Sequence, residues 1–289
     1  MAKIFITGSH GQLGRELQSL APEFPQHNFF FFDRSTLPVE DPDASQALLN
    51  REKPQWLINC AAYTAVDKAE TEKETAFEIN ADAVGYLASA CRRHHTRLIH
   101  ISTDYVFDCN SASPIKETDP TGPINTYGAS KLEGESQAAR EYPDGTIIIR
   151  TSWVYSEFGN NFVRTMLRLM KERPAISVVN DQIGAPTYAA DLAAAILHII
   201  GYPAFTPGIF NYSNEGKISW YDFAIAIRDA IGSTCTVNPI PTSQYPTPAR
   251  RPKYSLLDKT HIQNIYGVPI SEWQASLRTC LRRPGIRTH

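Results

Sequence analysis

Short apolar runs alternate with longer stretches of helical periodicity along the first half of the chain. The runs read KIFIT, NFFFFD, WLINC, TRLIHIS and TIIIRTS. After each run, apolar residues recur at the spacing of one face of an α-helix. Strands that alternate with helices are typical of βαβ units, which build a parallel sheet with helices on both faces. The pattern therefore predicts an α/β fold with a doubly wound, Rossmann-type parallel sheet.

The same pattern predicts how the chain is divided. The segment from Asp67 to His94 is long enough for a crossover helix between the third and fourth strands. After about Trp153 the strands become short, and a proline-rich tail follows. We therefore expect a larger domain over residues 1–152, joined by about 176–200, and a smaller α/β C-terminal domain that holds most of 153–289. The stretch PIPTSQYPTPARRP is either a flexible linker or a loop that lines a ligand cleft.

Composition and charge exclude several classes of protein. Of the 289 residues, 42% are hydrophobic and 20% are charged. No apolar stretch in the sequence reaches the length of about 18 residues that a membrane span needs. The 28 Lys and Arg are balanced by 30 Asp and Glu, so the chain has no basic field with which to bind nucleic acid. We expect a globular protein with neither a membrane nor a nucleic-acid partner.

Targeting signals and cysteine usage favour the cytoplasm. The N-terminal MAKIFITGSHG reaches a structured motif by its seventh residue, which leaves no room for a signal peptide. The five cysteines lack the paired close spacing of disulfide frameworks and CxxC metal sites. The residues that we expect to be free thiols of a cytoplasmic protein are Cys60, Cys91, Cys109, Cys235 and Cys280.

A glycine-rich loop follows the first predicted strand. Gly8, Gly11 and Gly14 lie in ITGSHGQLG, between that strand and a helix, which is the context of a dinucleotide-binding loop. Gly8 permits the tight turn, Gly11 lets the backbone approach a pyrophosphate, and Gly14 allows close packing of the helix. The free N–H groups and the dipole at the start of the helix favour the anion. We therefore expect the larger domain to bind a dinucleotide and the smaller one to bind the substrate.

The end of the second predicted strand bears on the choice of dinucleotide. Asp33 stands some distance after the glycine loop, where a carboxylate accepts hydrogen bonds from the adenosine ribose of NAD. Arg34 follows it, and a guanidinium there is able to bind the 2'-phosphate of NADP. The alternative for Arg34 is a solvent-facing side chain at the end of a strand. Both NADPH and NADH are therefore expected cofactors.

Tyr127 and Lys131 are candidates for proton transfer. Their spacing in YGASKLEGE places them on one face of a predicted helix. An ammonium near a phenol favours the phenolate, and we therefore expect Lys131 to lower the pKa of Tyr127. Ser102 and Thr103 end the fourth predicted strand, at the sheet edge where α/β proteins bind ligands. A hydroxyl there can hydrogen-bond a substrate carbonyl, whereas the alternative for both residues is a turn at the end of a strand.

These motifs resemble those of a known superfamily. TGxxGxxG from Thr7 to Gly14, STD from Ser102 to Asp104 and YxxxK from Tyr127 to Lys131 are similar to the motifs of the extended short-chain dehydrogenase/reductases. Further blocks resemble one family within it, the dTDP-4-dehydrorhamnose reductases. These blocks are AAYTAVDKAE, STDYVF, RTSWVY, GNNF, NDQIGAPT and YPTPARRP, and they span almost the whole chain. The resemblance implies reduction of the C4 keto group of dTDP-4-dehydro-L-rhamnose by NAD(P)H, which gives dTDP-L-rhamnose for polysaccharide synthesis.

The resemblance also implies which residues bind the cofactor. The loop after the first strand would contact the diphosphate of the cofactor, and the second strand would end at its adenosine ribose. The loop after the third strand would line the remainder of the cofactor. Together with the glycine loop and Arg34, the expected cofactor-binding residues are Gly8, Gly11, Gln12, Leu13, Gly14, Asp33, Arg34, Val39, Ala61, Ala62, Tyr63, Tyr127 and Lys131. Pro38 stands where family members often have an acidic residue, while Val39 is able to cover the adenine.

For the reaction, the resemblance implies three catalytic residues. Tyr127 would be the proton donor, and Lys131 would bind the nicotinamide ribose and tune Tyr127. Thr103 would hydrogen-bond the oxygen that Tyr127 protonates. The expected substrate-binding residues are Thr103, Asp104 and Trp153.

Several other residues have two interpretations. Some relatives dimerise through Mg²⁺ held by carboxylates, and Glu16 and Asp191 match two of those positions. The third carboxylate is absent from LRRPGIRTH, so no metal is predicted, and we expect either a monomer or a homodimer. Asn80 either supports the active site or bonds a neighbouring helical turn. Arg250 and Arg251 either clamp a nucleotide diphosphate or form a solvated pair.

Other functions compete with reduction of this sugar. The triplet Thr103, Asp104 and Tyr105 lacks the glutamate that sugar-nucleotide dehydratases usually carry at this place, which argues against dehydration. The alternatives that remain are a reductase of another nucleotide-linked 4-keto-6-deoxy sugar and a non-catalytic regulatory subunit with the same fold. An enzyme is favoured by the presence together of Thr103, Tyr127, Lys131 and Trp153.

Overall fold

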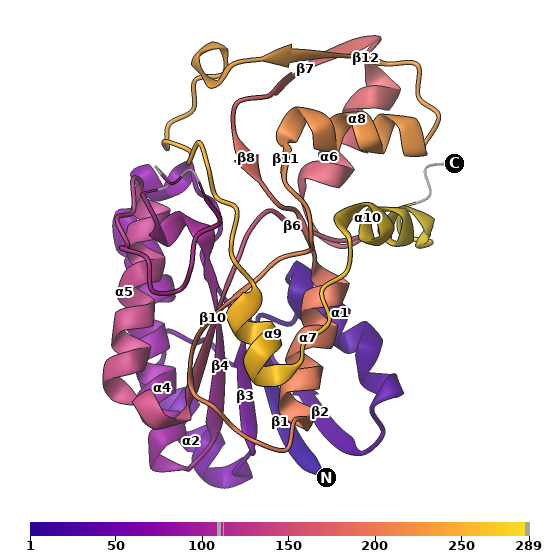
Figure 1. Cartoon of the computed structure of the whole chain (residues 1–289). Coiled ribbons are helices and arrows are strands. Elements are labelled where there is room, and N and C mark those ends of the chain that lie inside the picture. The colour runs from indigo at the N-terminus through magenta and orange to yellow at the C-terminus, as the bar shows by residue number, and fades with distance from the viewer. Residues whose placement is uncertain (109–110, 112, 287–289) are drawn as a thin grey trace.

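A six-stranded parallel sheet forms the centre of the larger region (Figure 1). The computed structural model describes residues 1–108, 111 and 113–286, so Cys109 lies outside the described residues. The sheet has the strand order β10-β5-β4-β3-β1-β2, and every pairing is parallel. Its strands are β1 (Ala2–Thr7), β2 (His27–Phe31), β3 (Trp56–Asn59), β4 (Arg97–Thr103), β5 (Thr146–Thr151) and β10 (Gly208–Tyr212). The predicted doubly wound α/β fold is confirmed.

Helices cover both faces of this sheet. One layer contains α1 (Gln12–Leu20), α7 (Ala189–Gly201) and α9 (Thr260–Tyr266), and the other contains α2 (Pro42–Glu52), α4 (Ala83–Arg93) and α5 (Thr126–Glu141). Because successive side chains of a strand point to opposite faces, Ile4 and Ile6 pack against the first layer and Phe5 against the second. Burial on both faces explains why these strands read as continuous apolar runs.

The crossover between β3 and β4 differs from the single helix predicted from Asp67 to His94. It consists of a 3₁₀ turn (Lys68–Glu70), α3 (Lys73–Phe77), a π-helical turn (Glu78–Asp82) and α4. The carboxylate of Asp67 caps no helix and binds a distant arginine, as described below. A π-helical turn widens the backbone locally and often marks a functional site.

The smaller region has a core of its own. It contains α6 (Phe162–Glu172), α8 (Trp220–Ala230), α10 (Trp273–Arg282) and the parallel pair β7 (Ala175–Val179) and β12 (Thr236–Ile240). The short pairs β6 (Val154–Tyr155) with β9 (Thr187–Tyr188) and β8 (Ile183–Gly184) with β11 (Ile218–Ser219) connect it to the sheet. Tyr155, Tyr188 and Phe223 pack at its centre, where all three are buried.

The chain crosses between the two regions more often than the sequence suggested. The expected segment 176–200 contains α7, but β7 at its start belongs to the smaller region. Residues 208–212 and 260–266 were not expected in the larger region, yet β10 completes the sheet and α9 packs on it. We therefore propose a division in which 1–152 is joined by 189–212 and by α9.

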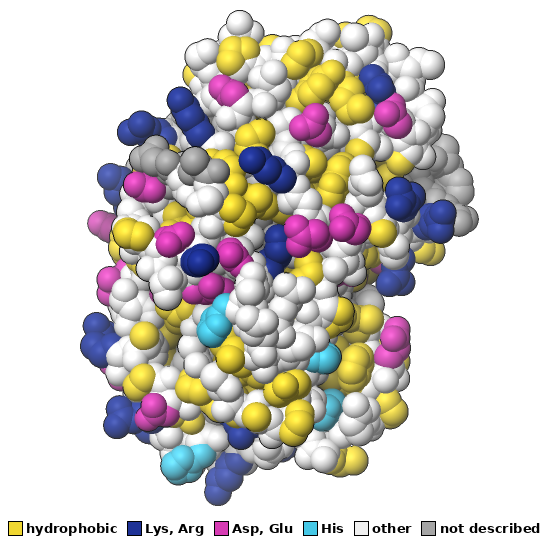
Figure 2. All heavy atoms as spheres, viewed as in Figure 1, with side chains coloured by type: hydrophobic (Ala, Val, Ile, Leu, Met, Phe, Trp, Pro, Cys, Tyr) yellow, Lys and Arg dark blue, Asp and Glu magenta, His cyan; other side chains and the backbone are white. Residues whose placement is uncertain are grey.

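The surface carries mixed charges. On the face drawn in Figure 2, basic and acidic side chains are interspersed and form no continuous basic field. Among the described residues, none of the helices combines the length and the apolar character needed to cross a membrane.

Candidate active site

The glycine loop lies between the carboxyl end of β1 and the start of α1. Gly8 has φ +65°, and a Cβ atom there would lie 2.6 Å from the backbone nitrogen of Ala61. The loop therefore needs glycine both for its left-handed backbone and for its contact with the segment after β3. Gly11 donates its N–H to the carbonyl of Gly8 at 3.0 Å and caps α1, whose first N–H groups have no partner within the helix.

A cavity of about 470 Å³ opens beside this loop. It collects eight of the expected cofactor-binding residues, namely Gly8, Gly11, Asp33, Arg34, Val39, Ala61, Ala62 and Tyr63. The side chains of Gln12 and Leu13 point elsewhere: the Gln12 amide oxygen accepts from Asn161 at 3.0 Å, and Leu13 is buried in the core of the sheet. Only backbone groups of these two residues are therefore able to meet a diphosphate.

Asp33 is held in place by the turn that follows it. Its Oδ1 accepts four hydrogen bonds, from the backbone and hydroxyl groups of Ser35 and Thr36, at 2.7–3.0 Å. These bonds, above all those from the two hydroxyls, lower the pKa of Asp33 to about 2. Its Oδ2 lies 3.6 Å from His10 Nε2, on the side of the cavity. A fixed, ionised carboxylate is what a pair of ribose hydroxyls requires.

Arg34 is paired with a residue that sequence reasoning missed. Its Nε and Nη2 lie 2.9 and 2.7 Å from the same oxygen of Glu40, which also lines the cavity. Glu40 comes two residues after Pro38. Leu37 and Val39 are both buried and form the apolar side of the cavity.

Asn80 lies in the π-helical turn and fixes the opposite wall of the cavity. Its amide oxygen accepts from the backbone N–H of Tyr63 at 2.9 Å, and its nitrogen donates to the Tyr63 carbonyl at 3.0 Å. The same nitrogen donates to Ser130 Oγ on α5 at 3.0 Å. Asn80 therefore joins the loop after β3 to the helix that carries Tyr127, and its side chain bonds these two segments and not a neighbouring turn of its own helix.

Tyr127 lies half-buried in the first turn of α5, hydrogen-bonded to Thr103 at the end of β4. Burial raises the pKa of Tyr127 to about 12; the Thr103 bond opposes this rise, and the neighbouring Asp104 adds a smaller contribution to it. The expectation of a lowered pKa was therefore wrong, because the loss of solvent around the phenol dominates. The phenol is protonated at neutral pH, which suits a proton donor.

Lys131 is almost fully buried on the same helix, at 1% exposure. Its Nζ donates to the carbonyl of Ile101 at 2.7 Å and lies 3.2 Å from Nε2 of His100. Burial lowers the pKa of Lys131 to about 8. His100 was not singled out from the sequence.

Ser102 points away from the site, in contrast to Thr103. Its hydroxyl donates to Glu135 at 2.5 Å, and Glu135 forms a buried ion pair with Arg150 at 2.6 Å. Neighbouring residues of a strand face opposite sides of the sheet, so only one of the two hydroxyls can reach the ligand. The expectation that Ser102 could bond a substrate carbonyl was therefore wrong, and its role is structural.

Asp104 is buried beside Thr103, whose hydroxyl donates to it at 3.0 Å. Burial raises the pKa of Asp104 to about 7, and hydrogen bonds from Ser255 and Thr103 oppose the rise. The carboxyl group of Asp104 is therefore poised between its neutral and charged forms near neutral pH.

Trp153 connects the site to the smaller region. Its backbone has φ +48°, a conformation that side chains other than glycine seldom adopt. The ring stacks on Trp220 with centroids 3.7 Å apart, and a Cβ atom at Gly184 would lie 2.9 Å from the Trp153 ring. Strained backbone of this kind is typical of functional sites. Trp220 and Gly184 were both missed by the sequence reasoning.

The proline-rich stretch is held against the larger region and is not a flexible linker. Arg251 forms a bidentate ion pair with Asp67 at 2.6 and 2.8 Å, and the Ala249 N–H donates to the same carboxylate. Asn125, which caps α5, donates to the carbonyl of Arg250 at 2.8 Å. The two arginines are therefore not a solvated pair: Arg251 is bonded, and only the Arg250 side chain is exposed.

The residues expected at a metal site are engaged in other contacts. Glu16 accepts from Ser156 at 2.5 Å, and burial raises its pKa, which disfavours the charged form that a metal needs. Asp191 accepts from Asn214 at 2.6 Å and from Ser276 at 2.5 Å. Within the described part of the chain, no three His, Cys, Asp or Glu side chains gather as metal ligands would. These residues do not fit a Mg²⁺ ion.

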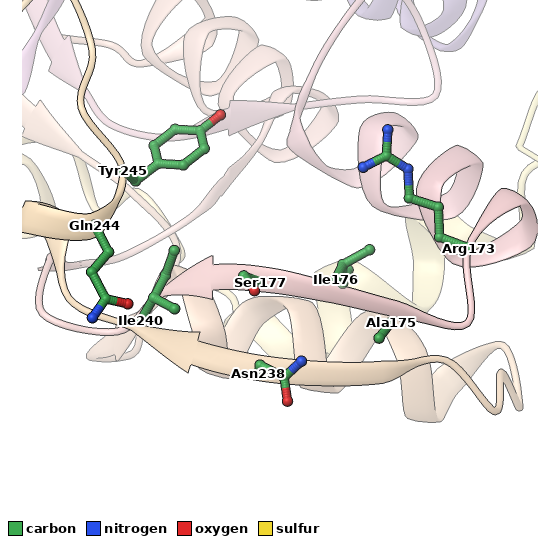
Figure 3. Close-up of a pocket in the computed structure, with 8 residues that line it drawn as sticks. All are labelled: Arg173, Ala175, Ile176, Ser177, Asn238, Ile240, Gln244 and Tyr245. Atoms are coloured by element: carbon green, nitrogen blue, oxygen red, sulfur yellow. The ribbon is translucent and has the colours of Figure 1, made fainter.

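A second cavity, of about 510 Å³, is lined in part by residues of β7 and β12 (Figure 3). These two strands lie at the far end of the smaller region (Figure 1). Arg173 and Tyr245 lie on opposite sides of the cavity in Figure 3, and Ser177 lies between them. Its lining contains none of the expected site residues. The candidate active site is therefore the cavity beside the glycine loop, together with Thr103 and Tyr127.

Comparison with known proteins identifies the family. A family model described as the RmlD substrate binding domain matches residues 2–285. The dTDP-4-dehydrorhamnose reductase of Aggregatibacter actinomycetemcomitans is 43% identical over 288 residues, which cover 96% of this chain and 98% of that protein. The chain belongs to the dTDP-4-dehydrorhamnose reductase family. The resemblance inferred from the sequence blocks is confirmed.

Solved structures of dTDP-4-dehydrorhamnose reductases have the same fold. The protein from Clostridium acetobutylicum is 40% identical, with a TM-score of 0.92, over 96% of this chain and 98% of that one. The protein from Bacillus anthracis, solved in complex with NADP, is 38% identical with the same TM-score of 0.92, over 97% of this chain and 98% of that one.

Proposed function

We propose that this chain reduces the C4 keto group of dTDP-4-dehydro-L-rhamnose with NAD(P)H and so forms dTDP-L-rhamnose. Membership of the reductase family supports the reaction, since its relatives are named for it. The observation that carries the proposal is the hydrogen bond between Tyr127 and Thr103, on the helix that also carries the buried Lys131 and that Asn80 joins to the loop lining the dinucleotide cavity.

The residues of the cavity fit a dinucleotide. The N-terminus of α1 and the Gly8–Gly11 turn would hold the diphosphate, Asp33 would bind the adenosine ribose, and Val39 would pack on the adenine. When bound, the reduced nicotinamide supplies a hydride to the sugar carbon. Arg34 makes NADPH a credible partner beside NADH, and the Bacillus anthracis relative was solved with NADP.

The chain's own residues would supply the proton. Tyr127 donates its phenolic proton to the oxygen on C4, and the Thr103 hydroxyl holds the same oxygen in place. The ammonium of Lys131, on the same helix face, stabilises the phenolate that Tyr127 leaves behind. Trp153 packs against the sugar, and Asp104 beside Thr103 contacts its hydroxyl groups.

The environment of Tyr127 favours reduction over elimination. The ring of Tyr105 packs edge-on against Tyr127, with centroids 5.7 Å apart, where a dehydratase would need a second acid or base. We further propose that the chain works in the cytoplasm as a monomer or homodimer. The four described cysteines are free, which agrees with a reducing compartment.

Replacing the proton donor tests this function. Tyr127→Phe should retain cofactor binding but lose about 10²-fold or more of turnover, because only the transferable proton is removed. The assay follows oxidation of the reduced cofactor with the 4-keto sugar nucleotide, and NMR gives the stereochemistry of the product. Tyr86→Phe changes an exposed tyrosine and is the matched control.

Three outcomes would contradict the proposal. Near-normal turnover by Tyr127→Phe would remove Tyr127 as the donor. A product of other stereochemistry would assign the chain to another 4-keto-6-deoxy sugar. Absence of turnover in the unmodified chain would favour a regulatory subunit.

Lys131→Met should lower turnover and also weaken cofactor binding, whereas a change in stability alone would show that Lys131 has only a structural role.

A further inference from the structure

A line of buried polar side chains crosses the middle of the sheet and ends at Lys131. Thr7 on β1, Asn59 on β3 and His100 on β4 occupy matching register positions in neighbouring strands. All three are at most 2% exposed. Thr7 Oγ1 donates to Asn59 Oδ1 at 2.7 Å, Asn59 Nδ2 lies 3.1 Å from His100 Nδ1, and His100 Nε2 lies 3.2 Å from Lys131 Nζ. Burying polar side chains in an apolar sheet costs free energy unless they are hydrogen-bonded to one another.

One backbone group fixes the direction of this line. The N–H of Ala61 donates to Asn59 Oδ1 at 3.2 Å, and a backbone N–H cannot act as an acceptor. The side-chain amide of Asn59 is therefore oriented with its oxygen toward Ala61 and its NH₂ group toward His100. Since that NH₂ group donates, Nδ1 of His100 must accept, and a neutral imidazole then carries its proton on Nε2.

The proton on Nε2 faces Lys131. An ammonium has three donors and no acceptor, so a charged Lys131 would place two donors against each other at 3.2 Å. A neutral amine has a lone pair that accepts the Nε2–H. The other bond of Lys131, to the carbonyl of Ile101, can be made by either form. The hydrogen-bond line therefore favours the amine.

The other groups around Lys131 do not reverse this preference. Cys60, after β3, faces it from the sheet, and burial raises the pKa of this thiol, so it is uncharged. Glu135, one turn further along α5, favours the ammonium, but its carboxylate is already bound by Arg150. Burial keeps His100 neutral by lowering its pKa. The lowered pKa of Lys131 agrees with the geometry.

We propose that His100 is a positioning residue that, through the Thr7–Asn59–His100 line, favours the neutral amine of Lys131 over its ammonium. The inference rests on the proposed roles of Tyr127 and Lys131. Its consequence is that His100 determines the pH above which the chain loses the charge that supports Tyr127. In the unmodified protein, kcat/KM should fall as the pH rises through about 8, where Lys131 loses its proton.

The first test is the pH profile of His100→Gln. The Gln carbonyl has two lone pairs and can accept from Asn59 and from the Lys131 ammonium at once. The alkaline limb of the kcat/KM profile should then move upward by about one pH unit or more. His198→Gln, the same change on α7 where the ring bonds the carbonyl of Tyr266, is the control and should leave the profile unchanged. An unmoved limb in His100→Gln would overturn the proposal.

The second test needs no turnover. Nitrogen NMR of the histidine rings in the unmodified chain, with the His100 ring assigned by correlation to its own backbone, reports which ring nitrogen carries the proton. We expect the Nε2–H form of His100, without protonation between pH 6 and pH 9. An Nδ1–H form, or a charged ring, would refute the inference even if His100→Gln did not fold. Because this result is independent of catalysis, it also separates failure of the inference from failure of the proposed function.

Discussion

Replacing Glu40 with glutamine should shift the chain toward NADPH. Arg34 is the residue able to bind a 2'-phosphate, but two of its nitrogens lie 2.9 and 2.7 Å from one oxygen of Glu40. A phosphate would have to compete with this carboxylate for the guanidinium, and the two anions would repel each other. Glu40→Gln removes the competing charge and retains the size of the side chain.

The size of the effect follows from the exposure of the pair. The Arg34 side chain is 75% exposed, so its bond to Glu40 is a surface ion pair that contributes about 0.2–1 kcal/mol. Releasing it should lower the KM for NADPH by about 1.4- to fivefold, at 1.4 kcal/mol per decade. The KM for NADH should not change, because NADH has no 2'-phosphate. Arg34→Ala should act in the opposite direction and raise the KM for NADPH by roughly tenfold or more.

Steady-state titrations with both cofactors measure these effects. The ratio of the two KM values is compared for the unmodified chain, Glu40→Gln and Arg34→Ala, and higher salt should shrink the difference by screening the charges. Glu23→Gln, an exposed glutamate outside the cavity, is the control. If Glu40→Gln changed both cofactors equally, or if Arg34→Ala left the ratio unaltered, Arg34 would act through packing and the reasoning would be refuted.

Three further predictions concern the packing of Trp153, the buried ion pair of Arg150 with Glu135, and the ionisation of Asp104. Gly184→Ala should displace the Trp153 ring, because the new methyl group would lie 2.9 Å from it; titrations should show a raised KM for the sugar nucleotide and an unchanged KM for the cofactor. Arg150→Met should leave Glu135 buried without its cationic partner and lower the free energy of unfolding, measured by urea denaturation, by about 3–5 kcal/mol. A free energy of unfolding equal to that of the unmodified chain within experimental error would contradict this prediction. The pKa of Asp104 is about 7 when folded, against an ordinary value of 3.8, so the stability contributed by its protonated form is lost progressively as the pH rises from about 4 to 7. Asp104→Asn cannot ionise, and its Tm should therefore rise relative to the unmodified chain between pH 4 and pH 7 and then level off, whereas a constant difference over that range would exclude this linkage.

Local patterns made much of the fold predictable from the sequence. The glycine loop, the apolar strands and the helix with Tyr127 and Lys131 each depend on neighbouring residues, and each was placed correctly. The GIFNY strand was missed, because five residues between a proline and a polar loop carry no periodic signal. Its place in the sheet is decided by pairing with β5, which is far away in the sequence.

The site was less predictable where it depends on orientation and burial. Strand alternation already implied that Ser102 and Thr103 face opposite sides, but not which of them faces the ligand. The pKa of Tyr127 was expected to fall because the sequence shows a nearby lysine and does not show how far solvent is excluded. The pairing of Arg34 with Glu40 and the contact of His100 with Lys131 arise only when separate loops and strands meet.

The position of β10 constrains how this protein can be taken apart or recombined. β10 pairs with β5 at the edge of the sheet but follows it in the chain by more than fifty residues. A fragment ending near residue 152 would therefore leave β5 as an unpaired edge strand that contains the consecutive residues Ile147, Ile148 and Ile149. Such an edge promotes self-association. A fragment that is meant to keep the sheet intact therefore has to include β10 as well as residues 1–152.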